Sequence, residues 1–250
     1  MKKFLTTLGV LALVLAAAGG AQAISLADLL AGQSITAGDK TFDQWRLIWE
    51  DYSDPALTVD SANIEVTALN DGGLDPGPGL HFSASAGALD VTGDGIYAYI
   101  DYMFGFRVTA GTGYLIKDNS LEITDAVVTN SGDNGMFIQE FAGTDPGLVD
   151  VPGDTSLPDL AVKDVEFSWL DGPGLTADLT DSASFAPHSQ IYVSKDILVW
   201  ASDVNETASL TGFTQRFSQV AAIPEPSTWW LMGLGLLGLA GVGRKMAVRA

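Results

Sequence analysis

The sequence contains no cysteine and only two histidines, His81 and His188. Without cysteine the chain has no disulfide bonds, no thiol nucleophile and no thiolate metal site, so its core alone must hold the fold. Two histidines are too few for a histidine-rich zinc site. The protein classes that depend on these groups are therefore excluded.

Basic residues are also scarce, and they are unevenly distributed. Five of the 12 Lys and Arg, but only one of the 31 Asp and Glu, lie in residues 1–23 and 224–250. Residues 24–223 carry seven basic and 30 acidic side chains, a net charge of −23. Such a body repels nucleic acid and anionic lipid, and it favours cations and neutral or basic polymers. The simpler interpretation of the acidity is a well-solvated surface.

Familiar catalytic motifs are missing as well. The sequence has no G-x-S-x-G elbow, no phosphate-binding glycine loop and no H-E-x-x-H. His188 beside Ser189 does not by itself indicate a catalytic triad. With 30 acids in the body, carboxylate pairs for glycoside hydrolysis are too numerous for any one to be informative. We expect a protein that is not an enzyme, and a secreted hydrolase is the catalytic alternative.

Residues 1–23 have the three parts of a secretory signal peptide. Lys2 and Lys3 are followed by an apolar run to about Ala18 and then by small residues at Ala21 and Ala23. This order predicts export and cleavage by signal peptidase after Ala23. A permanent membrane anchor is the alternative.

Residues 224–250 form a second apolar segment with a defined order. Pro224, Glu225 and Pro226 precede 15 uncharged residues, 229–243, and the basic residues Arg244, Lys245 and Arg249 follow. As a helix these 15 residues would span about 22 Å, which is short for a hydrocarbon core of about 30 Å. Five glycines weaken the helix further. The segment predicts a single transmembrane helix that serves as a temporary anchor, with its basic end in the cytoplasm.

The order of tripeptide, apolar span and basic tail resembles the PEP-CTERM sorting signal of Gram-negative bacteria. The resemblance implies that an exosortase, a membrane transpeptidase, recognises Pro224-Glu225-Pro226 and removes the tail. It also implies export across the inner membrane, transient anchoring, and delivery to the cell surface or extracellular matrix, where such proteins are commonly linked to polysaccharide and biofilm. An ordinary C-terminal membrane anchor is the alternative.

The body, residues 24–223, has the period-two alternation of β-strands. Residues 95–109 show it best, because Ile96, Ala98 and every second residue to Val108 are apolar. Similar runs occupy residues 63–69, 80–86, 121–128, 136–141, 161–169, 190–201 and 207–217. Turn-rich segments of Gly, Pro, Asn and Asp separate them. The pattern predicts an all-β body, an antiparallel β-sandwich or a jelly-roll-like fold, as one domain.

Several segments depart from this pattern. Residues 24–32 predict a short helix, and part of 41–52 is a second helical candidate. In residues 161–169, Lys163 falls among the inward-facing positions, where a charged side chain is out of place. Residues 69–80 resemble residues 169–175, which suggests either an internal repeat or two hairpin loops with similar turn chemistry.

Two kinds of binding site have candidate residues in the body. Asp/Asn/Gly loops can supply calcium with oxygen ligands; the candidates are Asp90, Asp94, Asn130, Asp133 and Asn134. They lack the spacing of an EF-hand loop, and turn formation is the simpler role. Exposed aromatic rings could stack on sugars, although core packing is their usual role; the candidates are Trp45, Trp49, Trp169, Trp200, Tyr97 and Tyr99. We expect no cofactor other than calcium.

These observations favour an exported, non-enzymatic surface or extracellular-matrix protein that is sorted through its Pro-Glu-Pro signal. The expected partners are signal peptidase, an exosortase and extracellular polysaccharide, but not nucleic acid. A carbohydrate-binding or calcium-dependent lectin-like module is the first alternative, and an exposed row of aromatic side chains would favour it.

Overall fold

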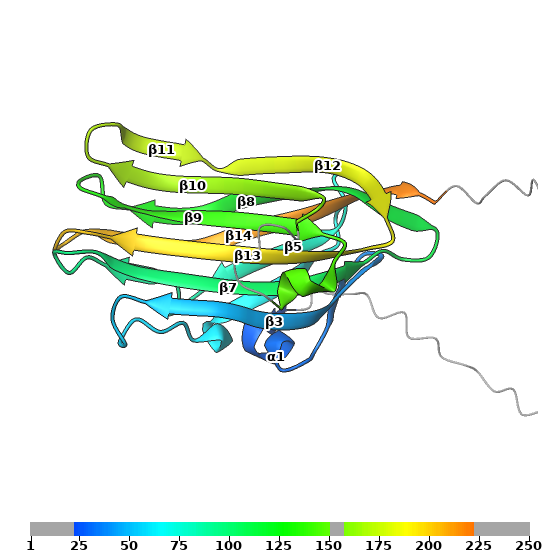
Figure 1. The fold of residues 1–250 in the computed structure, drawn as a ribbon, viewed down its shortest axis with the longest axis horizontal. Coiled ribbons are helices and arrows are strands. Elements are labelled where there is room, and N and C mark those ends of the chain that lie inside the picture. Colours follow the sequence, from blue (N-terminus) through cyan, green and yellow to red (C-terminus); the bar gives the residue numbers. More distant parts are fainter. Residues whose placement is uncertain (1–22, 151–157, 223–250) are drawn as a thin grey trace, which may run out of the picture.

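The computed structural model describes residues 23–150 and 158–222, which form two antiparallel β-sheets (Figure 1). Sheet A has the strand order β1 (Ala23–Ser25), β4 (Ile64–Leu69), β5 (Gly79–Ala84), β14 (Thr207–Ala221), β8 (Tyr114–Val128) and β12 (Thr180–His188), and β6 (Asp90–Thr92) also pairs with β14. Sheet B has the order β11 (Gly174–Asp178), β10 (Ala161–Leu170), β9 (Asn134–Gly143), β13 (Gln190–Ala201), β7 (Ala98–Thr109), β3 (Lys40–Tyr52) and β2 (Ile35–Ala37). Three short helical segments complete the described chain: α1 (Leu26–Leu30), η1 (Ser61–Asn63) and η2 (Pro146–Val149). The all-β prediction is confirmed.

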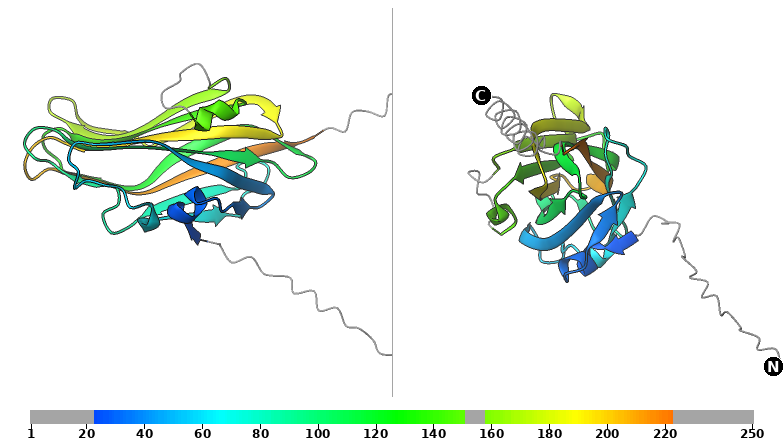
Figure 2. Two further views of the ribbon diagram at one scale, coloured as in Figure 1. Left: turned by 60° about the horizontal axis from the view of Figure 1, so that its bottom comes forward. Right: turned by 90° about the vertical axis from the view of Figure 1, so that its right-hand side faces the viewer.

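The two sheets lie face to face around one apolar core (Figure 2). Aromatic rings meet across the interface: Phe42 of sheet B lies 5.6 Å from Phe217 of sheet A, and Trp45 lies 6.4 Å from Phe82, measured between ring centroids. Full burial of a large apolar side chain contributes about 1.5–3 kcal/mol. The facing rings are therefore a main source of the attraction between the sheets.

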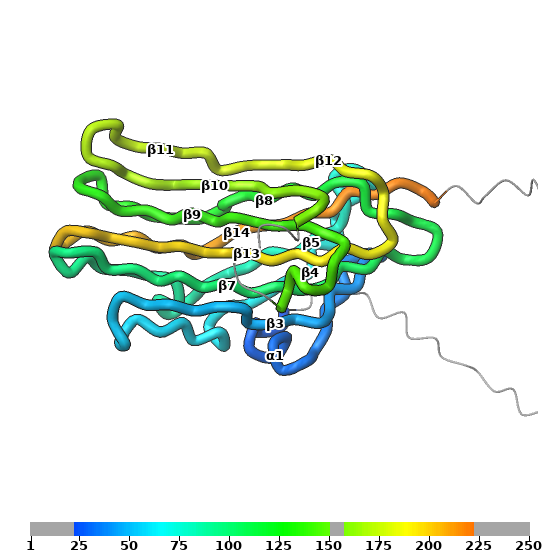
Figure 3. Tube along the Cα trace, viewed as in Figure 1, coloured from blue at the N-terminus to red at the C-terminus, as the bar shows by residue number. Residues whose placement is uncertain are grey.

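The two sheets come together along one edge of the molecule. The chain passes from β11 in sheet B directly into β12 in sheet A, as the trace in Figure 3 shows. A hydrogen bond reinforces this edge, where the backbone N–H of Asp164 in β10 donates to Asp181 Oδ2 in β12 at 3.1 Å. This edge therefore brings β10 close to β8 and β12.

The strand predicted at residues 95–109 begins three residues later, as β7, and lies between β13 and β3. Its inner side chains from Ala98 to Val108 are buried, as the alternation predicts. Ile96 is 84% exposed, because Asp94 Oδ1 accepts hydrogen bonds from the backbone N–H groups of Ile96 and Tyr97 and holds this segment in a turn. The turn therefore delays the start of the strand to Ala98, although the apolar alternation extends back to Ile96.

The helical prediction for part of residues 41–52 is wrong, because the segment belongs to strand β3. β3 pairs with β7, but its register shifts twice, between Asp43 and Arg46 and between Leu47 and Trp49. Gln44 has a φ of 54°, which marks the first irregularity. Such bulges interrupt the alternation on which strand prediction depends. The other helical prediction is confirmed by α1, whose N-cap Ser25 accepts a hydrogen bond from the Asp28 N–H.

The outer face of sheet B carries a second, smaller apolar cluster of Met103, Phe141, Leu148, Val149 and Tyr192. It is buried because η2 covers this part of the sheet. A Cβ atom on Gly105 would lie only 2.7 Å from Val149 Cγ1, so a glycine at this position in β7 is what lets η2 approach. Met103 alternates onto the outer face as the sequence predicts, yet a distant segment shields it from solvent.

The two similar loop sequences, residues 69–80 and 169–175, lie in different sheets. The first leads from β4 to β5 and the second joins β10 to β11, and both strand pairs are antiparallel. Similar turn chemistry in two hairpin connections therefore accounts for their resemblance.

Lys163 lies inside the protein, as its place in the alternation of residues 161–169 predicts. Lys40, Lys163 and Lys195 are buried to within 1% of complete burial, and they are three of the seven cations in residues 24–223. Each of the seven pairs with a carboxylate; the other four are Arg46, Arg107, Lys117 and Arg216. Nearly half of a scarce residue type is thus placed in the interior.

Candidate functional site

The predicted sorting signal and the signal peptide core lie outside the described residues. This applies to the predicted span 229–243 and to Pro224, Glu225, Pro226, Arg244, Lys245 and Arg249. Within residues 23–150 and 158–222, no helix is both long and apolar enough to cross a membrane. The folded body extends almost to the tripeptide, because the Ala222 N–H still donates to the Gly113 carbonyl at 2.8 Å.

The predicted signal peptidase site lies at the other end of the described chain, in strand β1. Ala23 pairs with Thr67 and is exposed, whereas Ile24 is buried. Cleavage after Ala23 would remove one exposed residue of β1 and leave the buried part of the strand in place. The predicted site and the fold are therefore compatible.

The calcium candidates are spread over the β6 strand, two loops and the start of β9, and four of their eight side-chain oxygens accept hydrogen bonds within the protein. Asp90 Oδ1 accepts a hydrogen bond from Ser209 Oγ at 2.5 Å, and Asp133 Oδ1 accepts one from Trp200 Nε1 at 2.9 Å. The Asn134 amide donates to the Thr129 and Ser131 carbonyls, which closes its own loop. Among the described residues, no three His, Cys, Asp or Glu side chains are placed to hold a metal ion. Calcium binding stays a prediction, which a melting curve with added calcium or chelator would test.

The candidate aromatic residues divide between the core and the outer face of sheet B. Trp45 is buried between the sheets, Trp200 is largely buried, and Trp169 is half-buried near the end of β10. Trp49 and Tyr97 are 48% and 41% exposed, and the Tyr97 and Tyr99 ring centroids lie 5.6 Å apart. Solvent therefore reaches four of the six rings, and three of these, Trp49, Tyr97 and Tyr99, lie on β3, just before β7 and on β7.

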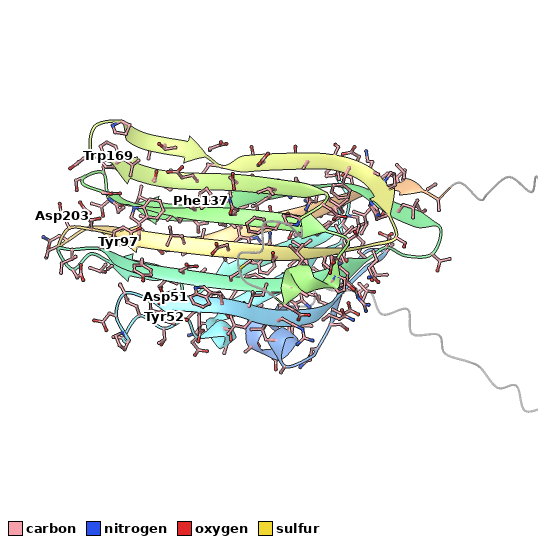
Figure 4. All side chains as sticks on the ribbon, in the orientation of Figure 1. Asp51, Tyr52, Tyr97, Phe137, Trp169 and Asp203 are labelled. Carbon is pink, nitrogen blue, oxygen red and sulfur yellow. The ribbon has the colours of Figure 1, made fainter. Side chains whose placement is uncertain are left out.

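These rings frame a surface that we call the aromatic face, defined by Trp49, Tyr97, Tyr99, Phe137 and Leu198 with the acids Asp51, Asp101 and Asp196. Strand register places its side chains in rows. One row runs across β9, β13, β7 and β3 through Phe137, Leu198, Asp101 and Asp51. Figure 4 shows Phe137, Tyr97 and Asp51 spread across these strands. The surface is broad and combines apolar rings with hydrogen-bond acceptors.

The electrostatics of the aromatic face centre on Asp101. Burial raises the pKa of Asp101 to about 7, helped by a hydrogen bond to Asp196 and by the charges of Asp196 and Asp51. Asp101 Oδ1 is buried without a hydrogen-bond donor, which fits a carboxyl group that holds a proton near neutral pH. Asp51 is fixed differently, because Tyr99 Oη donates to Asp51 Oδ2 at 2.8 Å. The face thus offers carboxylate acceptors beside a carboxyl group, Asp101, whose pKa is raised.

Two surface depressions lie elsewhere, along β8. One is lined by Ser120, Leu121, Glu122, Thr180, Asp181 and Ser182, and the other by Ile123, Thr124, Asp125, Ala126, Phe167 and Leu179. The first contains two acids and the second contains one. Neither includes an exposed tryptophan or tyrosine, so the aromatic face is the stronger candidate for ligand binding.

Comparison with known proteins identifies the segment that follows the body. Residues 222–245 match the family model of the PEP-CTERM protein-sorting motif. A search of the curated proteins finds no match to this chain. The motif confirms the resemblance based on Pro224, Glu225 and Pro226. This chain therefore carries a PEP-CTERM protein-sorting motif, which indicates an exported protein that is processed by an exosortase and sorted at the membrane to the cell surface.

Proposed function

We propose that this protein is a non-enzymatic component of the cell surface or extracellular matrix whose β-sandwich body attaches to extracellular polysaccharide. The sorting motif supports the destination, because it indicates an exported, exosortase-processed protein. The aromatic face supports the attachment, because solvent-exposed rings beside carboxyl groups suit a sugar ring. Such rings cover its apolar face, and the acids accept its hydroxyl hydrogens.

The charge of the body narrows the polymer class. A net charge of −23 over residues 24–223 repels an acidic polysaccharide and tolerates a neutral or basic one. Asp51 and Asp196 place part of this charge at the aromatic face itself. We therefore expect binding to neutral or amino-sugar polymers, with affinity for polyanions only at high salt.

Binding is tested by electrophoresis of the released protein through gels that contain a neutral glucan, chitosan or an acidic polysaccharide. Substitution of Trp49 and Tyr97 by alanine should weaken retardation by the preferred polymer about tenfold or more, which corresponds to about 1.4 kcal/mol. Tyr114→Ala is the matched control, because Tyr114 is similarly exposed but lies on β8 of sheet A. Equal retardation of wild type and the double variant would remove the aromatic face from the proposal.

The destination is tested at the tripeptide. Replacement of Pro224, Glu225 and Pro226 by alanine should leave the uncleaved protein in the membrane fraction of its own host. Replacement of Pro146 and Pro187 by alanine provides a control with a similar loss of proline inside the body. Immunoblotting of the membrane fraction and the medium measures release. Normal release of the tripeptide variant would contradict sorting through this motif.

A further inference from the structure

Four polar side chains meet in the core, between the two sheets. Glu140 of β9 lies between Lys163 of β10 and Lys195 of β13 in direct register on the inner face of sheet B. Asn119 of β8 faces them from sheet A. All four side chains are buried to within 1% of complete burial. Polar groups this deep are found only where their mutual contacts offset the loss of water.

The contacts join an amine, a carboxamide and a carboxylate in a closed triangle. Lys163 Nζ donates to Asn119 Oδ1 at 2.7 Å, which places the amine next to the carboxamide carbon. Asn119 Nδ2 donates to Glu140 Oε1 at 2.6 Å, and the same oxygen is bonded to Lys163 Nζ. Glu140 therefore touches both the nitrogen that could attack and the nitrogen that could leave.

The cluster contains one positive charge too many. Glu140 pairs through Oε1 with Lys163 and through Oε2 with Lys195, so two ammonium groups share one carboxylate. Burial is the main cause that lowers the pKa of Lys195 to about 8; Glu140 opposes this shift, and the charge of Lys163 adds to it. The two lysines outweigh burial at Glu140 and lower its pKa. An uncompensated charge in a dry core is strongly unfavourable, so a reaction that removes one would be favoured.

We propose that Lys163 and Asn119 form an intramolecular amide bond, with Glu140 as the proton carrier. Nothing in the sorting signal or in the proposed binding face requires such a bond. It would join β10 of sheet B to β8 of sheet A covalently, between residues 44 positions apart in the sequence. In a chain without cysteine it constrains the unfolded state in the way that a disulfide does.

The reaction balances without an oxidant or a cofactor. Glu140 takes a proton from the Lys163 ammonium group, and the freed Nζ lone pair attacks Asn119 Cγ. The Nζ–Cγ bond forms while the Cγ–Nδ2 bond breaks. Glu140 passes a proton from Nζ to Nδ2, which leaves as ammonia and takes the remaining proton as ammonium. Asn119 and Lys163 are then joined by a neutral amide, and Glu140 and Lys195 remain as a balanced ion pair.

The setting favours this reaction in two further ways. The strands hold the reacting groups in contact, which replaces a bimolecular encounter by an intramolecular one. The packed core around the cluster excludes water, so neither the intermediate nor the product meets a competing nucleophile. Phe213 lies on this side of the core, with Lys195 Nζ 5.8 Å from its ring centroid.

The bond is tested on the full-length protein made in its own host, without any substitution. Digestion with a protease that cuts after Asp and Glu should yield peptides 119–122 and 160–164 joined together. The mass of the joined product should equal the sum of the two peptide masses minus the mass of one ammonia. Recovery of the two peptides separately, at their sequence masses, from folded protein would overturn the proposal. Ammonia loss within a single peptide would also overturn it, because that indicates cyclisation of one residue.

Two substitutions assign the roles. Asn119→Ala should abolish the joined peptide because the electrophile is gone, and Glu140→Gln should abolish it although both reacting groups remain. Lys40→Met is the matched control, because it removes another buried lysine and should leave the joined peptide intact. Formation of the joined peptide in folded Glu140→Gln protein would exclude Glu140 as proton carrier. If either variant does not fold, the digest of the unsubstituted protein still decides whether the bond exists.

Discussion

Two lysines reach from sheet B toward a carboxamide in sheet A, and they do so in different surroundings. Lys163 meets Asn119 beside the fully buried Glu140. Lys40 meets Gln219 beside Asp39, whose side chain is 22% exposed. Asp39 is hydrogen-bonded to Lys40, whereas Glu140 is bonded to both amine and carboxamide. Both sites thus have a lysine amine in contact with a carboxamide. Only the Lys163 site has a carboxylate that contacts both groups.

The charge balance differs in the same direction. At Lys40 one lysine lies beside Asp39, and burial lowers the pKa of the lysine against the attraction of Asp39 and Asp118. At Lys163 two lysines share one glutamate. The first arrangement has no excess of lysines over acids, and the second has one lysine too many. Contact between amine and carboxamide is therefore not enough for the proposed reaction. It also needs a carboxylate that contacts both groups and an excess of positive charge.

The largest difference between the sites should follow from removal of the acid. Glu140→Ala leaves two buried ammonium groups without a counter-charge, and we expect a loss of about 3–5 kcal/mol or a failure to fold. Asp39→Ala affects a partly exposed pair, and we expect about 1 kcal/mol or less. Denaturation in guanidinium chloride measures both. Similar losses at the two positions would mean that the sites are equivalent.

A smaller effect should appear in the pH dependence of stability. In Asn119→Ala the cross-link cannot form, both lysines still share Glu140, and Lys195 keeps a pKa near 8 in the folded state. Between pH 8 and about 10.4 the unfolded chain binds a proton at this lysine that the folded chain lacks. Stability of the variant should therefore rise with pH by on the order of 2–3 kcal/mol over this window.

The cross-linked wild type should lack most of this rise, because Lys195 then has Glu140 as its own partner. Unfolding free energies of both proteins at pH 7.5 and pH 10 provide the measurement. The same pH dependence in variant and wild type would show that no excess charge had been removed.

The smallest effect belongs to the outer face of sheet B, where three acids adjoin each other without a lysine. The folded state holds a proton on Asp101 up to a pH of about 7, whereas the unfolded state releases it near pH 4. Stability should therefore fall as pH rises between these values. Asp101→Asn should be about 1 kcal/mol more stable than wild type at pH 8, after allowance for partial exposure, and the gain should vanish near pH 4.

Asp178→Asn is the control for Asp101→Asn, because it removes one acid from an exposed strand end. Thermal melting at pH 4 and pH 8 distinguishes the two variants. An equal gain in both would trace the effect to the overall net charge of the body instead of to the Asp101–Asp196 pair.

Alternation predicted most strands because each inner face is continuous and apolar. Residues 190–201 were predicted with the same bounds as β13, whereas β3 was missed at its bulges near Gln44. The alternation of inner and outer positions also predicted that Lys163 faces the core. Glu140 alternates with Met136 and Ile138 on the same side of β9, so the same argument would have predicted a second buried charge.

The partners of Lys163 could not be read from the sequence. Asn119 and Glu140 are 44 and 23 residues away from it, and only the stacking of the two sheets brings them together. The aromatic face could not be predicted from the sequence either. Whether Trp49 points outward depends on a register shift in β3, and whether Met103 is shielded depends on η2. Long-range pairing decides these features, whereas alternation reports only a local preference.

β14, the final strand of the described chain, lies in the interior of sheet A, where it pairs with β5, β6 and β8. During export from the N-terminus, sheet A therefore cannot close until Ala221 has left the translocation channel. Only Ala222 and Ile223 separate β14 from the tripeptide. An exosortase that cuts at the tripeptide would therefore act next to the strand that completes sheet A.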